Sequence, residues 1–229
     1  NNEVGSVLPV DKLRKMIGMK NAPALLHIDC VQAFGKIKFS PKKLGADFVS
    51  VTAHKIHGPK GTGALYIRKG ARIVPRTFGG EQEKRIRPGT EASPLIAGFA
   101  AAVNALPDID EQHEKISALH SFTKVTLLKI GGVKINSPDN ASPYILNVYI
   151  PTFMRSQTIV QELSANYGIY VSNGSACAKG KKSHVLSAMH LSDEVADKSI
   201  RISFSRDNTQ QDCERLCSAI EDIIKKHPR

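Results

Sequence analysis

The sequence has no tryptophan, only four cysteines and no long apolar run. Its longest apolar stretch, residues 96–103, suits a buried helix and is too short to cross a membrane, which takes about 20 residues. The cysteines, at positions 30, 177, 213 and 217, match neither a disulfide framework nor a CxxC metal pair. We therefore expect a cytoplasmic protein without a membrane span. The chain begins at Asn1 with neither Met nor a signal-like segment, so we expect a fragment or a processed chain.

Positive charge exceeds negative charge, with 32 Lys and Arg against 21 Asp and Glu. The basic residues are spread along the chain, except for the group Lys179, Lys181 and Lys182. There is no zinc-finger spacing and no aromatic-basic motif of an RNA-binding domain. We expect a solvated basic surface that can meet anionic cofactors or acidic proteins, without direct nucleic-acid readout.

The first half of the chain alternates between short apolar segments and helical patterns. Residues 24–29, 47–52 and 64–68 read as buried strands, and residues 10–19 and 93–106 as helices. Continuously apolar strands separated by helices are typical of an α/β fold, with a mainly parallel sheet and helices on both faces.

The pattern changes after a long amphipathic helix over residues 110–130. Strands at 133–135, 145–150, 169–171 and 200–204 alternate with helices at 156–167, 183–190 and 209–226. This order predicts a smaller α+β domain. We expect residues 1–115 to belong to a large domain and residues 116–229 to form the small one.

An acid and a lysine follow neighbouring predicted strands. Asp29 ends the first strand, and Lys55 lies just past the second. Open α/β sheets bind ligands at the carboxyl ends of their strands. A carboxylate and an amine placed there are what pyridoxal 5'-phosphate (PLP) needs, one for its ring nitrogen and one for its aldehyde. Taken singly, Asp29 is more often a helix cap or structural acid in such a position, and Lys55 is more often a surface residue.

Cys177 lies in a stretch of small polar residues, glycines and lysines, which predicts a mobile loop. Nearby lysines favour the thiolate, the nucleophilic form of cysteine. The alternative is an incidental exposed cysteine.

His54 and His57 have no third ligand nearby in the sequence, so we expect no metal site. Cys213 and Cys217 share one face of a predicted helix and read as core residues.

Several segments together resemble the cysteine desulfurases, in the class-V aminotransferase branch of the fold-type-I PLP enzymes. They occur in the family's order over nearly the whole chain: residues 1–5 (NNEVG), 27–36 (HIDCVQAFGK), 53–61 (AHKIHGPKG), 79–83 (GGEQE) with 87–91 (RPGTE), 174–177 (GSAC) and 199–206 (SIRISFSR). The resemblance implies part of the PLP-transferase type I large domain, followed by a smaller α+β domain that carries the cysteine loop.

The resemblance assigns cofactor contacts. Lys55 would hold the aldehyde and move protons, and Asp29 would pair with the pyridinium nitrogen. The remaining contacts are Gln32 to the phenolic oxygen, Thr52 and His54 to the phosphate, Thr90 to the phosphate of the partner subunit in a homodimer, and Asn2 to the ring.

The resemblance also implies the reaction. Arg201 would bind the carboxylate of L-cysteine, with Asn2 on the substrate side of the cofactor ring. Cys177 would attack the substrate sulfur, leaving L-alanine and a persulfide on Cys177. The sulfur would pass to an acceptor protein, such as an iron–sulfur scaffold or a tRNA-thiolation enzyme.

The chain departs from the family at two places. The stretch after Cys177 is lysine-rich and somewhat short, which leaves the acceptor open. The family's N-terminal half is missing, so we expect either a fragment or a second chain that completes the fold, and a fragment alone is expected to bind PLP weakly or not at all. Two other functions stay open. One is a selenocysteine lyase or another class-V lyase or aminotransferase, which would not need Cys177. The other is an inactive scaffold that binds partner proteins.

Overall fold

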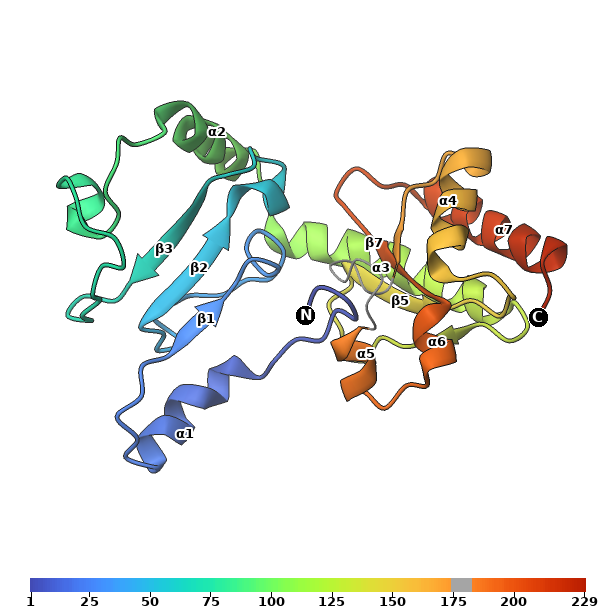
Figure 1. The fold of residues 1–229 in the computed structure, drawn as a ribbon, viewed down its shortest axis with the longest axis horizontal. Coiled ribbons are helices and arrows are strands. Elements are labelled where there is room, and N and C mark those ends of the chain that lie inside the picture. Colours follow the sequence, from blue (N-terminus) through green and yellow to red (C-terminus); the bar gives the residue numbers. More distant parts are fainter. Residues whose placement is uncertain (174–182) are drawn as a thin grey trace. The chain divides into compact units, whose positions relative to one another are not determined.

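The structure is a computed structural model that describes residues 1–173 and 183–229 (Figure 1). These residues form two compact units. The N-terminal unit is Leu8–Asp110, and the C-terminal unit combines Asn1–Val7 with Glu111–Arg229. The division falls near the start of helix α3 (Ile109–Leu128), the helix that also contains the expected boundary at residues 115 and 116. Unlike the expected division, it groups the first seven residues with the C-terminal unit.

The N-terminal unit is built on a three-stranded sheet of order β1-β2-β3: β1 (His27–Asp29), β2 (Phe48–Thr52) and β3 (Gly63–Ile67). β1 and β2 are parallel, as the sequence pattern predicts, whereas β3 runs antiparallel to β2. The link from β2 to β3 holds only the short 3-10 helix η2 (Ala53–Ile56) and a turn. So short a link reverses the chain, because a parallel neighbour needs a crossover of a dozen or more residues. The sheet is therefore mixed.

One face of this sheet is packed and the other carries polar groups. Leu26, Ile28, Cys30 and Val49 form its buried cluster. η1 (Val10–Lys12) and α1 (Leu13–Met19) pack against that cluster through Val10 and Ile17. Because side chains alternate along a strand, His27 and Asp29 point to the opposite face, where they are exposed. Later in the chain come η3 (Gln82–Arg85) and α2 (Ser93–Asn104), and α2 contacts η2.

The C-terminal unit has a four-stranded sheet in which every pair is antiparallel. Its order is β4-β5-β7-β6: β4 (Lys134–Ile135), β5 (Ile145–Tyr149), β7 (Ser199–Ser203) and β6 (Ser172–Asn173). All of β5 is buried, as expected for a central strand covered by helices. The helices are α3, α4 (Ser156–Tyr167) and α7 (Gln210–Lys226), with the short α5 (His184–Ala188) and α6 (Asp193–Asp197). α4 and α7 contact each other (Figure 1).

The last short strand begins later than its apolar pattern predicts. Residues 169–171 are the apolar ones, but the strand pairing is made by Ser172 and Asn173. Gly168 closes α4 in the left-handed region at φ 65°, and the Ile169 N–H then bonds the Leu163 carbonyl at 2.9 Å. Ile169 therefore takes part in the C-terminal cap of α4, and the strand pairing with β7 starts only at Ser172. No helix in the described part of the chain is long and apolar enough to span a membrane.

Candidate functional site

Asp29 stands at the carboxyl end of β1, on the polar face of the N-terminal sheet. Its Oδ1 accepts a hydrogen bond from the Val31 N–H at 2.9 Å, which turns the chain out of the strand. The side chain is otherwise exposed. Asp29 pairs in register with Ser50 of β2, and the Ser50 hydroxyl lies 2.7 Å from His27 Nε2. A carboxylate, a hydroxyl and an imidazole therefore share this face.

The carboxyl end of β2 carries a second polar group. Thr52 ends the strand, and its Oγ1 lies 2.9 Å from Nδ1 of His54. The same hydroxyl donates to the Thr62 carbonyl at 3.2 Å, so a hydroxyl and an imidazole are held together at the start of η2. Lys55 follows on η2 and is half-buried. Because β1 and β2 are parallel neighbours, Asp29 at the end of β1 and Lys55 just past the end of β2 lie at one edge of the sheet.

The tight turn after Lys55 depends on local backbone geometry. His57 closes η2 in the left-handed region at φ 67°, and the Gly58 N–H bonds the Ala53 carbonyl at 2.9 Å. A Cβ at Gly58 would lie 2.9 Å from the Ala53 side chain and 3.0 Å from its carbonyl oxygen. Only glycine leaves room for this return of the chain, which sets the direction in which η2 leaves β2.

Two further predicted residues lie elsewhere in this unit. Gln32 is half-buried in the turn that follows Asp29, where the Ala33 N–H bonds the Cys30 carbonyl at 3.0 Å. It therefore stays close in the chain to the strand end. Thr90 is exposed in the segment between η3 and α2, and belongs to no helix or strand.

The C-terminal unit brings Asn2 and Arg201 together although they are far apart in the sequence. Arg201 lies on β7, half-buried, and its Nη1 donates to the Asn2 carbonyl at 2.9 Å. Its Nη2 donates to the Ser172 hydroxyl at 3.1 Å. The guanidinium is thus held in one orientation by the N-terminal segment on one side and by β6 on the other. Asp29 and Lys55 belong to the other unit.

Cys177 lies outside the described residues. The chain on either side of residues 174–182 is described. Ser172 and Asn173 pair with Arg201 and Ile200 of β7. Ser183 follows the interval and is buried, and its hydroxyl donates to a carboxylate oxygen of Glu3.

The other three cysteines are buried thiols. Burial, together with the negative charge of Asp29, raises the pKa of Cys30 to about 11. Burial also raises the pKa of Cys213, and it raises the pKa of Cys217 to about 12. These thiols stay protonated at neutral pH and are poor nucleophiles.

Sequence reasoning missed several polar residues of these two sites. His27 and Ser50 could have been found, because each shares strand parity with a polar neighbour on the same face. Glu3, Ser172 and Ser183 carried no signal of this kind. Their partners lie tens of residues or more away in the sequence, and only the fold brings them together.

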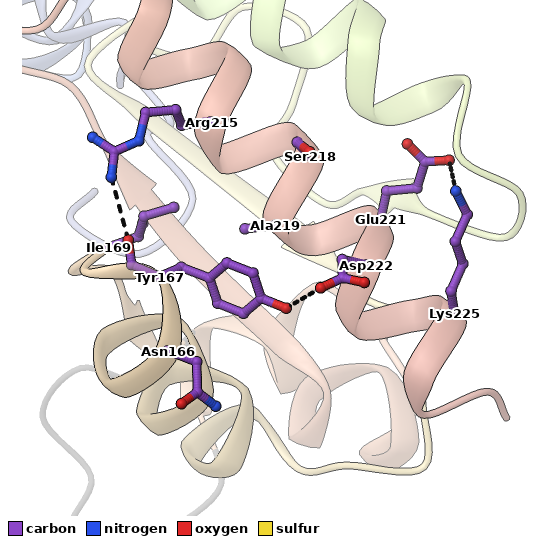
Figure 2. A pocket seen from close by; sticks show the side chains of 9 residues that line it. All are labelled: Asn166, Tyr167, Ile169, Arg215, Ser218, Ala219, Glu221, Asp222 and Lys225. Atoms are coloured by element: carbon purple, nitrogen blue, oxygen red, sulfur yellow. Dashed lines mark hydrogen bonds and ion pairs between the residues drawn. The ribbon is translucent and has the colours of Figure 1, made fainter.

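A separate open cavity of about 600 Å³ lies between α4 and α7 (Figure 2). Tyr167 points across it and donates its hydroxyl hydrogen to Asp222. Lys225 pairs with Glu221 at 2.6 Å, and an Arg215 Nη2 reaches the Tyr167 carbonyl at 3.4 Å. Within this cavity Glu221 pairs with Lys225, and Asp222 pairs with the neighbouring Lys226, so neither carboxylate is left to select a ligand. Among the described residues, no group of three His, Cys, Asp or Glu could hold a metal ion.

Comparison with known proteins identifies the family. Residues 1–216 match the family Aminotransferase class-V. The chain is 40% identical over 231 residues to a cysteine desulfurase of Gluconacetobacter diazotrophicus, covering 99% of this chain and 57% of that protein. It is 37% identical to the putative cysteine desulfurase IscS 1 of Bacillus subtilis, covering 99% of this chain and 60% of that protein. The chain belongs to the class-V aminotransferase family.

Solved structures give the same fold. A NifS-like protein superposes with a TM-score of 0.88 at 39% identity, over 99% of this chain and 59% of that one. A NifS-like protein from Rickettsia africae gives a TM-score of 0.86 at 34% identity, over 98% of this chain and 60% of that one. The fold is therefore the α/β fold of the type I PLP enzymes, as predicted. The chain spans about three-fifths of the length of these relatives.

Proposed function

We propose that the protein carrying this chain is a PLP-dependent cysteine desulfurase, which takes sulfur from L-cysteine and leaves L-alanine. The observation that carries the proposal is the arrangement of Asp29 and Lys55. Asp29 ends one of two neighbouring parallel strands and Lys55 follows the end of the other, with the hydrogen-bonded pair Thr52 and His54 next to Lys55. Membership of a PLP-dependent family and the cysteine desulfurases among the relatives support it.

The donor set of the N-terminal unit fits PLP. Val31 engages one carboxylate oxygen of Asp29, which leaves the other to accept a hydrogen bond from a protonated ring nitrogen. The Thr52 hydroxyl and the His54 imidazole are groups of the kind that donate to a phosphate dianion, and Thr52 would turn its hydroxyl hydrogen from the Thr62 carbonyl to the phosphate. Lys55 would hold the aldehyde, Gln32 would reach the phenolic oxygen, and bound PLP would supply an electron sink.

The C-terminal unit supplies the groups for the substrate in this proposal. Arg201 is half-buried, and hydrogen bonds to Asn2 and Ser172 fix its plane. A planar guanidinium held in this way suits bidentate binding of the substrate carboxylate. Asn2, whose carbonyl orients Arg201, would contact the cofactor ring on its substrate side.

Cys177 is the proposed nucleophile. Its thiolate would bond to the substrate sulfur as the substrate C–S bond breaks, giving a persulfide on Cys177, and the carbon would take a proton to form alanine. The high pKa values of the buried Cys30 and Cys217 support this assignment, because those thiols remain protonated.

The proposal includes a homodimer, a cytoplasmic location and an acceptor protein for the sulfur, either an iron–sulfur scaffold or a tRNA-thiolation enzyme. Thr90 is exposed, and Val74 and Phe78 between β3 and η3 are 85% and 83% exposed. Apolar side chains exposed to this degree support an interface that lets Thr90 reach the partner subunit's phosphate site.

The three buried cysteines form no disulfide with one another, and such thiols support the proposed location in a reducing compartment.

The test measures alanine released from L-cysteine by the purified full-length protein loaded with PLP, together with the sulfide that an added thiol reductant releases from the persulfide. Lys55→Ala is expected to abolish both the visible absorbance of the bound cofactor and the activity. Cys177→Ala is expected to keep the absorbance and to lose about 100-fold or more of the activity. Lys60→Ala is the matched control, because Lys60 is an exposed lysine of the same turn.

Two results would redirect the assignment. Alanine release that survives Cys177→Ala would favour a selenocysteine lyase or another class-V lyase. A folded wild-type protein that shows no cofactor absorbance, yet binds partner proteins, would favour the inactive scaffold.

A further inference from the structure

Three polar side chains form one row across the sheet of the C-terminal unit. In the register of the strands, Asn147 of β5 pairs with Arg201 of β7, and Arg201 pairs in turn with Ser172 of β6. Residues paired across neighbouring strands point to the same face of a sheet. Asn147, Arg201 and Ser172 therefore share one face, with Arg201 in the middle of the row. The proposed function uses Arg201 and its bond to Ser172, but it gives no role to Asn147.

The N-terminal segment lies across this row. The Asn2 carbonyl accepts a hydrogen bond from Nη1 of Arg201 at 2.9 Å. The next carbonyl along the chain, that of Glu3, accepts from Nδ2 of Asn147 at 3.1 Å. Two consecutive carbonyls are therefore bound by two side chains that are paired across the strands. The Asn2 carbonyl can orient Arg201 only if its own position is fixed, and the bond from Asn147 to the adjoining residue fixes it.

The turn made by residues 1–5 has an internal framework as well. Oδ1 of Asn1 accepts the Glu3 N–H at 2.8 Å and the Val4 N–H at 3.1 Å, and the Gly5 N–H bonds the Asn1 carbonyl at 3.2 Å. These bonds shape the turn, whereas the bond from Asn147 attaches it to the central strand of the sheet. A displacement of the Glu3 carbonyl is therefore passed on to the rest of the turn.

The amide of Asn147 is held in one orientation. Its side chain is fully buried, and its Oδ1 accepts from Nδ2 of Asn136 at 2.8 Å. The same Nδ2 donates to the Ser199 hydroxyl at 2.8 Å, and Ser199 donates to the Val195 carbonyl. Because Oδ1 is engaged as an acceptor by Asn136, Nδ2 is the end of the amide that faces Glu3. Buried amides are costly without such bonds, so this network favours a single geometry.

We propose that Asn147 is a positioning residue for binding of the substrate carboxylate. By holding the Glu3 carbonyl, it keeps the adjoining Asn2 carbonyl in place to orient Arg201. This inference rests on the proposed function, in which Arg201 binds the carboxylate of L-cysteine. Without Asn147 the guanidinium samples more orientations, and fewer of them suit two-point binding of a carboxylate. Contacts to the amine of the substrate are not affected.

The first experiment compares the binding of L-alanine with that of ethylamine, which is the same amine without its carboxylate. The full-length protein loaded with PLP is titrated with each compound, and the visible absorbance of the bound cofactor is followed. Asn147→Ala is expected to reduce the preference for L-alanine about fivefold, the effect of one neutral hydrogen bond. The KM for L-cysteine is expected to rise by the same factor, with kcat within about twofold.

Asn136→Ala tests the orientation of the Asn147 amide. It is expected to reduce the preference for L-alanine by no more than Asn147→Ala does. The double variant is expected to match Asn147→Ala, because Asn136 acts through Asn147. If Asn147→Ala does not fold, Asn136→Ala carries the test with the same expected direction.

Hydrogen exchange gives a second readout, which needs no cofactor. In the full-length protein without PLP, Asn147→Ala is expected to speed exchange in a peptide that covers residues 1–5, because the turn loses its attachment to β5. The matched control is Gln112→Ala. Gln112 is a buried amide of the same unit that donates to the Tyr144 hydroxyl at 2.8 Å instead of to residues 1–3. It is expected to keep the preference for L-alanine and the exchange of residues 1–5.

Any of four results would overturn the inference. They are equal weakening of L-alanine and ethylamine binding in Asn147→Ala, a kcat that falls while KM holds, an equal loss of preference in Gln112→Ala, and unchanged exchange of residues 1–5 in Asn147→Ala. Each of these rejects the role of Asn147 and leaves the proposed function standing.

Arg201→Ala separates this inference from the proposed function. It removes the group proposed to bind the carboxylate and is expected to lower the preference for L-alanine about 100-fold. An Arg201→Ala protein that keeps the wild-type preference, or a wild type whose absorbance does not respond to L-alanine, rejects the proposed function and this inference with it.

Discussion

The side chain of Asp47 is fully buried and is the best place to test how the N-terminal unit is held together. Its Oδ2 accepts the Leu26 N–H at 2.7 Å and an Arg14 Nη2 hydrogen, and its Oδ1 accepts from Nε of Arg68 at 2.7 Å. One carboxylate therefore ties together α1, the start of β1 and the end of β3.

These ties matter for the site because Asp47 directly precedes β2. Its carbonyl also accepts the Arg68 N–H at 2.8 Å. The register that sets Asp29 opposite Ser50 is established at this end of the sheet, beginning with the pair His27 and Phe48.

We expect Asp47→Asn to destabilise this unit by about 3 kcal/mol. The substitution keeps the shape of the side chain but leaves two guanidinium groups without their anion. Removing one member of a buried ion pair costs about 3–5 kcal/mol. We take the lower value because the side chains of Arg14 and Arg68 are 38% and 49% exposed, so water partly replaces the lost partner.

Hydrogen exchange followed by mass spectrometry measures this loss where it occurs. Peptides covering β1 and β2 are expected to exchange about 100-fold faster in Asp47→Asn, while peptides from β5 and β7 keep the wild-type rates. The control is Glu221→Gln, which breaks an exposed pair with Lys225 and is expected to change stability by less than about 1 kcal/mol.

The same carboxylate predicts a loss of stability in acid. Burial raises the pKa of Asp47, but hydrogen bonds from Leu26, Arg68 and Arg14 outweigh it and lower the pKa from 3.8 to about 2. A carboxyl group whose pKa is lower in the folded state than in the unfolded state stabilises the folded protein. This contribution is present at pH values above the unfolded pKa, and it is lost as the pH falls through the folded pKa. The wild type is therefore expected to lose about 2 kcal/mol between about pH 4 and pH 2 through this group.

Asp47→Asn lacks the titrating group, so its stability is expected to fall less steeply over this pH range. The reasoning is refuted if the variant exchanges at wild-type rates in β1 and β2, or if its acid profile has the wild-type slope.

Three further outcomes are expected. Iodoacetamide at pH 7 is expected to modify Cys177 in the folded protein and to spare Cys217, because burial raises the pKa of Cys217 to about 12. Equal modification rates of the two cysteines in a mass-spectrometric time course would contradict this. Gly58→Ala is expected to weaken PLP retention at least about tenfold by displacing η2, and unchanged cofactor absorbance on dialysis would argue against it. Tyr167→Phe removes the hydrogen bond from the Tyr167 hydroxyl to Asp222 on α7. It is expected to lower the free energy of unfolding, measured in urea, by about 1 kcal/mol and to leave kcat unchanged. A lower kcat would give the cavity of Figure 2 a role in the reaction.

Sequence patterns predicted those parts of the fold that depend on local periodicity. The helix expected at 156–167 is α4 as observed, and the apolar run at 24–29 predicted the strand that ends in Asp29, although the observed strand covers only His27–Asp29. Parallel pairing of the first two strands also followed, because a long crossover links them. The direction of β3 was missed, since apolar character alone carries no strand direction.

The amino-acid sequence by itself determined the family, the order of the strand-end residues and the chemistry available to Asp29, Lys55, Arg201 and Cys177, because these follow from residue type and near-neighbour spacing. The tertiary structure alone decided that Asn2 orients Arg201, that Glu3 holds Ser183, and that one carboxylate at Asp47 joins three elements. Such bonds join positions between 21 and 199 residues apart. No local pattern records them, because their energy arises only when packing brings the partners together and removes them from water.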